Sequence, residues 1–375
     1  MPRAGCTNVR SRLGRRPYCR RPYCRRPYCR RIRARTRSNA GHRPGQQRRG
    51  QTMIKTQAGK SPCHIIVQFK ETIIKTPTIL AAAMLMLASF AHAEPAATNV
   101  KHAENTIQTG NQRLFASADG AFYELTLGSA GWSKAQVPVR FRDGVARSCY
   151  FLGIAESAGM VYTMCTEDSL NPLAKKHLFG LNTAQPAQLT EVGELKNMAL
   201  PNGLAADGNG NLYAADSGWP LLPGTLQKIT LAGPYAIASQ TTFHRFVLCK
   251  PNGVRYANGK LYVSTNPFSY LGLSQLLRYD LGANGLSNQT QIYSSLAFLD
   301  DFALVDGGAV VAEFLGARIV HINENGGELH QATFSQPTSV TLLTATQFGS
   351  GSLLVTQRNV GDIQHFANSW GLRPR

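Results

Sequence analysis

A phrase that recurs at a fixed interval constrains the fold of this chain more than any other feature. PNGLAADGNGNLYAADSG at 201–218 returns as PNGVRYANGKLYVSTN at 251–266, and LDDFALVDGGAVVAEF at 299–314 follows the same pattern. An interval of about fifty residues is typical of architectures in which each repeat is one supersecondary unit. The chain therefore has to stack several such units to build a core.

Three weaker copies fall on the same spacing and bring the number of units to six. They begin AENTIQ, SCYFLG and QPTSVT and span 103–125, 148–165 and 336–357. Each unit reads as an apolar run, a turn rich in Gly, Asn or Asp, a second β-rich run and then an outer strand, which are hairpin signals. Units of three or four strands are the blades of a propeller, whereas a β-sandwich does not explain the period. The sequence predicts an all-β, six-bladed β-propeller over residues 94–375.

The net charge of +19 suggests a nucleic-acid-binding protein until the charge is divided by segment. Residues 1–93 carry 21 of the 40 Lys and Arg residues but one of the 21 Asp and Glu residues. Residues 94–375 are therefore close to neutral. We expect no nucleic-acid partner for the propeller.

The first 52 residues form a basic low-complexity segment. They contain seventeen Arg residues and no acid, and RRPYC is repeated three times between Arg15 and Cys29. A segment with few apolar side chains and strong charge repulsion cannot bury a core. Perfect short repeats favour translated upstream DNA, a gene start placed too early, over a nucleic-acid-binding arm or a metal-binding cysteine repeat.

Residues 53–93 have the parts of a secretory signal peptide. A weakly basic stretch precedes the apolar run ILAAAMLMLASF at 79–90, and AHA precedes Glu94. The apolar run is shorter than the roughly 20 residues that cross a bilayer as a helix. We expect cleavage near Ala93–Glu94, a periplasmic or secreted protein, and no membrane contact after cleavage.

Two cysteines of the mature chain are candidates for a disulfide. Cys149 and Cys165 lie symmetrically about a turn at 156–159, so a hairpin would bring them face to face. Export permits such a bond. Two buried thiols remain the alternative.

Oxygen-bearing side chains stand where the inner strand of a unit begins. They are Glu104, Asn202, Asn252 and Asp301. Inner strands of a propeller begin at one end of the central channel, so we expect these side chains to converge on the axis. Two carboxylates and two amide oxygens suit Ca²⁺ or another divalent cation. Each residue alone is typical of turn chemistry, and Asp300 replaces Asp301 if the strand begins one residue earlier.

The same segments resemble the senescence marker protein/gluconolactonase superfamily of six-bladed propellers. The resemblance rests on AEN at 103–105, PNGLAADGNGNLYAADS at 201–217, PNGVRYANGKLYV at 251–263 and DDFALVDGGAVVAEF at 300–314. It implies that Glu, Asn, Asn and Asp at these positions form a divalent-metal site. It also implies hydrolysis of small-molecule lactones or related esters at the channel mouth.

If the protein is an enzyme, we expect a calcium-dependent hydrolase of the gluconolactonase or lactonase type. Asp301, or Asp300 beside it, would activate water or act as the nucleophile, while Glu104, Asn202 and Asn252 hold the ion. The alternative is a non-catalytic periplasmic propeller that binds a small ligand or a protein partner, since propellers host many functions. The substrate and the oligomeric state stay open.

Overall fold

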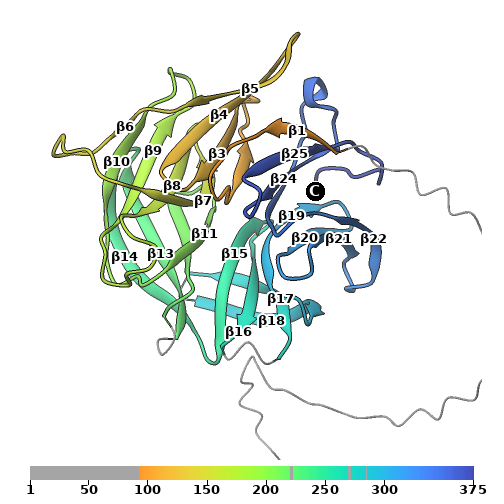
Figure 1. Ribbon diagram of the computed structural model, residues 1–375. Coiled ribbons are helices and arrows are strands. Elements are labelled where there is room, and N and C mark those ends of the chain that lie inside the picture. The colour runs from red at the N-terminus through yellow and green to blue at the C-terminus, as the bar shows by residue number, and fades with distance from the viewer. Residues whose placement is uncertain (1–92, 220–222, 269–271, 284) are drawn as a thin grey trace, which may run out of the picture. The chain divides into compact units, whose positions relative to one another are not determined.

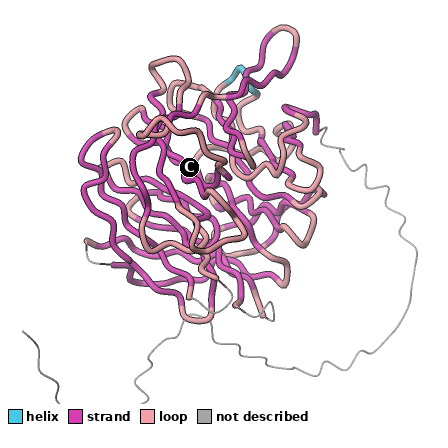
Figure 2. The backbone as a smooth tube through the Cα atoms, turned by 60° about the vertical axis from the view of Figure 1, so that its left-hand side comes forward, coloured by secondary structure: helices cyan, strands magenta, loops and turns pink. Residues whose placement is uncertain are grey.

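The computed structural model describes residues 93–219, 223–268, 272–283 and 285–375. These residues form 25 β-strands and one short 3₁₀-helix, Thr346–Phe348, and Figure 2 shows strands joined by loops along the described backbone. No helix among them is long and apolar enough to cross a membrane. The basic segment 1–52 and the expected signal peptide lie outside the described residues, apart from Ala93.

Six separate sheets confirm the predicted six-bladed β-propeller. The first three blades are β2 (Thr106–Gln108), β3 (Leu114–Ala118), β4 (Ala121–Gly128) and β5 (Gly131–Gln136); β7 (Tyr150–Ser157), β8 (Met160–Thr166), β9 (Lys176–Asn182) and β10 (Leu189–Leu195); and β11 (Pro201–Ala206), β12 (Asn211–Asp216), β13 (Gly224–Gly233) and β14 (Ala236–Phe246). The next two are β15 (Cys249–Ala257), β16 (Lys260–Pro267), β17 (Ser274–Gly282) and β18 (Gly285–Ser295); and β19 (Leu299–Val305), β20 (Gly308–Glu313), β21 (Arg318–Asn323) and β22 (Glu328–Thr333). Short strand β6 (Val139–Arg140) runs parallel to β10 in the second blade.

The sixth blade is built from both ends of the described chain. It consists of β23 (Pro337–Leu342), β24 (Leu353–Gln357), β25 (Asp362–Phe366) and, on its outer edge, β1 (Ala93–Ala97). Strand β1 pairs antiparallel with β25, and the two run side by side in Figure 1. Because this strand closes the sixth blade beside the first, the ring depends on it.

Six apolar clusters lie between neighbouring blades. Between the first and second blades, for example, Phe115 and Phe122 pack against Phe151 and Phe179. Equivalent clusters join each further pair of blades, including the sixth and the first. The core is therefore distributed around the ring, and it leaves the inner strands to line the axis.

We expect removal of β1 to open the ring. Protein that begins at Glu94 keeps three of the four residue pairs between β1 and β25, whereas protein that begins at Thr98 keeps none. The shorter protein should therefore lose at least about 2 kcal/mol of unfolding free energy relative to the longer one. Urea unfolding of the two proteins measures the difference. Equal stabilities would show that β1 does not hold the ring closed.

Candidate functional site

The inner strands share one irregularity near their beginning. In β15 the pairing register shifts between Pro251 and Val254, so that Asn252 and Gly253 together stand opposite Ser264. The inner strands β7, β11, β19 and β23 shift at the corresponding place. Such a bulge gives each of these inner strands two successive residues at the mouth of the channel. The first faces the axis, and the second faces the next blade.

The register decides which residues are equivalent. The first bulge position is held by Leu152, Asn202, Asn252, Asp300 and Thr338. In the first blade the amide of Asn105 donates to Ser117 Oγ at 3.0 Å, as the amide of Gly253 donates to Ser264 Oγ at 2.7 Å, and this places Glu104 at the same position. Asp300 rather than Asp301 is thus the counterpart of the two asparagines.

The glycine at the second bulge position of the second and third blades makes room for the neighbouring blade. A Cβ on Gly153 would lie 2.3 Å from Asn202 O, and one on Gly203 would lie 2.4 Å from Asn252 O. Real Cβ atoms do not approach a backbone oxygen so closely, so only glycine allows these inner strands to meet. The Pro-Asn-Gly phrase is therefore explained first by the packing of adjacent strand starts.

Glu104 lies buried at the point where the first, second and sixth blades meet. Its side chain is 5% exposed, and its Oε1 accepts a hydrogen bond from the Tyr150 hydroxyl and lies 3.0 Å from the Arg358 guanidinium. Burial raises the pKa of the Glu104 carboxyl, while Arg358 and Tyr150 oppose that rise and the charge of Asp301 adds to it. The site thus holds a carboxylate that needs a positive neighbour.

Tyr150 is held in place by the disulfide next to it. Cys149 and Cys165 are bonded, with their Cα atoms 5.4 Å apart, so the structure selects the disulfide over the two buried thiols. Burial raises the pKa of Tyr150 far above its ordinary value. The hydroxyl therefore stays protonated and donates a hydrogen bond to Glu104 Oε1.

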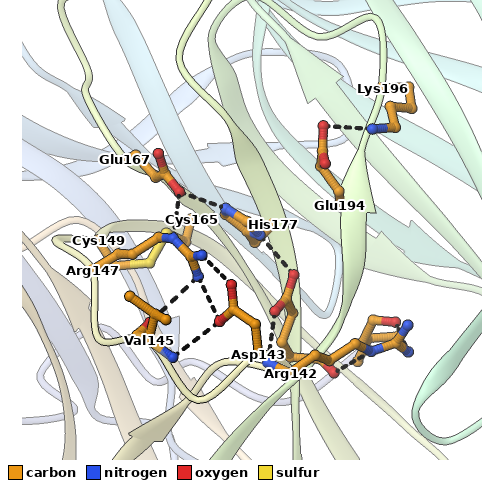
Figure 3. Close-up of polar contacts among 12 residues, drawn as sticks. Arg142, Asp143, Val145, Arg147, Cys149, Cys165, Glu167, His177, Glu194 and Lys196 are labelled. Carbon is orange, nitrogen blue, oxygen red and sulfur yellow. Dashed lines mark hydrogen bonds and ion pairs between the residues drawn. A yellow bond between two sulfur atoms is a disulfide. The ribbon is translucent and has the colours of Figure 1, made fainter.

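A polar network lies on the outer side of this disulfide (Figure 3). Arg147 donates to Asp143 Oδ1 at 3.0 Å and lies 3.4 Å from Glu167 Oε1. The two ring nitrogens of His177 lie 3.1 Å from Glu167 and 2.8 Å from Glu191. These contacts hold the chain that leads into Tyr150, and Arg147 is paired with Asp143 and Glu167.

Asp300 and Asn252 form the other half of the site. Burial raises the pKa of Asp300 well above its ordinary value, and the charges of Glu104 and Asp301 raise it further. The Asn252 side chain hydrogen-bonds to Asp300, but its Oδ1 has no hydrogen-bond partner among the described residues although Asn252 is 5% exposed. An unpartnered buried oxygen on a side chain that contacts a carboxylate is an unsatisfied acceptor that a cation would satisfy.

Asp301, unlike Asp300, is paired with an arginine. Its Oδ2 accepts from the Arg255 guanidinium, and its Oδ1 accepts from the Phe302 amide at 2.8 Å. Arg255 also lines a cavity of about 380 Å³ that is bounded by residues of all six inner strands. The Asp301–Arg255 pair therefore belongs to the central channel and already has its own counter-charge.

The remaining predicted ligand, Asn202, occupies the equivalent position in the third blade with a half-buried side chain. Among the described residues no group of three or more His, Cys, Asp or Glu side chains is placed to hold a metal ion. A mixed set of Glu104, Asp300 and the free Asn252 oxygen nevertheless has the chemistry that Ca²⁺ prefers. These oxygen donors fit a divalent cation, but the Arg358 guanidinium already pairs with one of them, Glu104.

The sequence analysis did not identify Tyr150 or Arg358. Tyr150 follows a cysteine at the start of an inner strand, and Arg358 follows the second strand of the sixth blade. Both positions are at blade ends on the same side as Glu104. Their sequence signal is weak, because polar residues follow strands at many other blade ends.

We expect Gly203→Ala to destabilise the ring strongly. The new Cβ would meet Asn252 O at 2.4 Å, so the unfolding free energy should fall by more than about 2 kcal/mol. Gly233→Ala is the matched control in the same blade, because no described atom lies within 4 Å of its Cβ position. Thermal and urea unfolding of both variants provide the comparison, and equal effects would contradict the packing argument.

We expect Asp300→Asn to stabilise the chelator-treated protein increasingly as the pH rises. A carboxyl whose pKa is raised by folding binds its proton more tightly in the folded state, so its ionisation costs stability above the ordinary value of 3.8. The gain should be small near pH 4 and at least ~1 kcal/mol at pH 8. Asp306→Asn, an exposed change in the same blade, should show no such trend, and a pH-independent gain at Asp300 would refute the assignment.

Comparison with known proteins gives a fold but no close relative. No protein-family model matches the sequence, and no curated protein matches it. A gluconolactonase from Xanthomonas campestris superposes with a TM-score of 0.54 at 17% identity, over 78% of this chain and 95% of that one.

Two further structures are similar to the same extent. A putative oxidoreductase (glucose dehydrogenase) from Thermus thermophilus gives a TM-score of 0.51 at 15% identity, over 73% of this chain and 99% of that one. The major allergen Mala s 1 of Malassezia sympodialis gives 0.53 at 11%, over 72% and 93%. At these identities the likeness shows the fold alone: the chain is a six-bladed β-propeller.

Proposed function

We propose that this protein is a divalent-cation-dependent hydrolase of small lactones or related esters, with its active site at the mouth of the propeller channel. The observation that carries the proposal is the meeting of Glu104, Asp300 and the unpartnered Asn252 Oδ1 at one end of the axis. Buried carboxylates beside a free amide oxygen are costly unless they serve a ligand. The likeness to a gluconolactonase structure agrees with this chemistry.

In this proposal, Glu104, Asp300 and Asn252 hold the cation, and Asn202 joins them from the third blade. Ca²⁺ is the ion that the oxygen donors favour, although another divalent cation would satisfy the same set. The bound ion would supply Lewis-acid polarisation of the ester carbonyl. Tyr150 fixes the orientation of Glu104 through its hydroxyl.

Asp300 is the better candidate for activating water. Of the two adjacent carboxylates, Asp301 is occupied by Arg255 and by the Phe302 amide. Asp300 is hydrogen-bonded by the Asn252 side chain, and its carboxylate would stay ionised beside the bound cation, as a general base must be. Asp300 would take a proton from that water as its oxygen attacks the carbonyl carbon. The ring C–O bond of the ester would then break, and the leaving alkoxide would take the proton back from Asp300, giving the hydroxy acid.

We also propose that the protein is exported after cleavage of the signal peptide at 53–93. The disulfide between Cys149 and Cys165 supports an oxidising compartment. Strand β1 begins at Ala93, so cleavage before Glu94 would leave nearly the whole strand to close the sixth blade.

The test is turnover of a panel of γ- and δ-lactones and aryl esters by protein expressed from Glu94. We expect hydrolysis that is lost on chelation and restored by CaCl₂, and a fall in kcat of at least about 100-fold for Asp300→Asn and for Glu104→Gln. Asn252→Ala should weaken cation dependence by removing the free amide oxygen. Asp306→Asn is the matched control, because the same change at the exposed end of the same blade should leave turnover intact.

Each result bears on the assignment. Turnover that persists in Asp300→Asn but disappears in Asp301→Asn would move the catalytic role to Asp301. Absence of turnover on the whole panel by folded protein with bound calcium would overturn the hydrolase assignment and favour a propeller that binds a small ligand or a protein partner.

A further inference from the structure

The Arg358 side chain lies over the candidate site and comes from the last blade of the ring. Arg358 follows β24 directly and lies in the turn that leads to β25. The guanidinium lies 3.0 Å from Glu104 Oε1 and its carbon lies 5.7 Å from the centre of the Tyr150 ring. The backbone amide of Arg358 is tied to the blade by a hydrogen bond to Gln336 O at 3.2 Å.

The electrostatics of the site single out this arginine. Glu104 and Asp300 are both buried, and the Arg358 guanidinium pairs directly with Glu104. Arg255 pairs with Asp301 instead. Arg358 is therefore the guanidinium that compensates the Glu104 side of the site in this structure.

The exposure of the two partners differs strongly. The Glu104 side chain is 5% exposed, whereas the Arg358 side chain is 39% exposed. A long side chain at a turn can move into solvent without disturbing the blade, whereas the carboxylate cannot follow it. The guanidinium can leave, and a small ion can take its place.

We propose that Arg358 is a built-in counter-ion that competes with a divalent cation for Glu104 and Asp300. The carboxylates then face either the guanidinium or the metal ion, and Arg358 sets how tightly the ion binds. The inference rests on the cation site of the proposed function, but it concerns the affinity of that site rather than its chemistry.

Two features argue against a merely structural ion pair. Pairs between exposed side chains contribute little, but here one partner is buried, and loss of the other leaves an uncompensated charge. The unpartnered Oδ1 of Asn252 also lies beside Asp300 and has no donor from Arg358 among the described contacts. The arginine thus supplies charge to the site and leaves one of its oxygen ligands unsatisfied, as expected for a stand-in cation.

The test is titration of chelator-stripped protein, expressed from Glu94, with CaCl₂ in an isothermal calorimeter. We expect Arg358→Gln to bind calcium at least about tenfold more tightly than the wild type, because a like charge near the ion has been removed. Arg358→Lys retains the charge and should stay close to the wild type. Arg245→Gln, an exposed change on β14, is the matched control.

A second measurement covers the case in which Arg358→Gln folds poorly without the ion. Its melting temperature should lie below that of the wild type in chelator, and calcium should raise it by more than it raises that of the wild type. The double variant Glu104→Gln/Arg358→Gln should lose both the tighter binding and the larger calcium response.

The outcomes separate this inference from the proposed activity. Equal or weaker calcium binding by Arg358→Gln, or no binding by either protein, would overturn the competition whatever the lactone assay shows. Tighter binding by the variant supports the competition even if no lactone is hydrolysed, since the measurement contains no substrate.

Discussion

Six inner strands have to begin side by side around one axis, and the close approach of these strand starts is the constraint on which the rest of the structure depends. Each bulge places two residues at the crowded mouth, and in the second, third and fourth blades the second of them is a glycine because the next blade lies against it. The first residue of the bulge is then left to face the axis. Packing therefore creates a ring of equivalent positions before any chemistry is assigned to them.

The first bulge positions differ in charge. The two carboxyls belong to the first and fifth blades, on either side of the sixth. Glu104 and Asp300 carry carboxyls, Asn202 and Asn252 carry amides, and the second and sixth blades contribute Leu152 and Thr338. Burial makes the two carboxyls resist ionisation. A buried pair of acids with a partly exposed guanidinium is a site whose stability depends on which cation it holds. The same burial that costs stability prepares the pair for a ligand.

Local patterns in the sequence were sufficient to predict the blades, because hairpin turns and β-rich runs are set by neighbouring residues. The repeated Pro-Asn-Gly also located the inner strand starts in two blades. In the fifth blade Asp300 and Asp301 stand where the third and fourth blades have Asn-Gly. Without the glycine a single sequence does not show which aspartate occupies the axial position, whereas the strand register does. Tyr150 and Arg358 reach Glu104 across blade boundaries. Contacts of that kind depend on ring closure, which no local pattern reports.

Strand β1 gives this ring its slowest contact to form. Residues 93–97 pair with residues 363–366, so the chain must bring together segments separated by almost the entire propeller. Loops of that length are closed late in folding. Until then the edge of β25 presents unpaired backbone groups, which are a template for association with another chain. The time that β1 takes to pair with β25 thus also determines how long the folding protein is prone to aggregate.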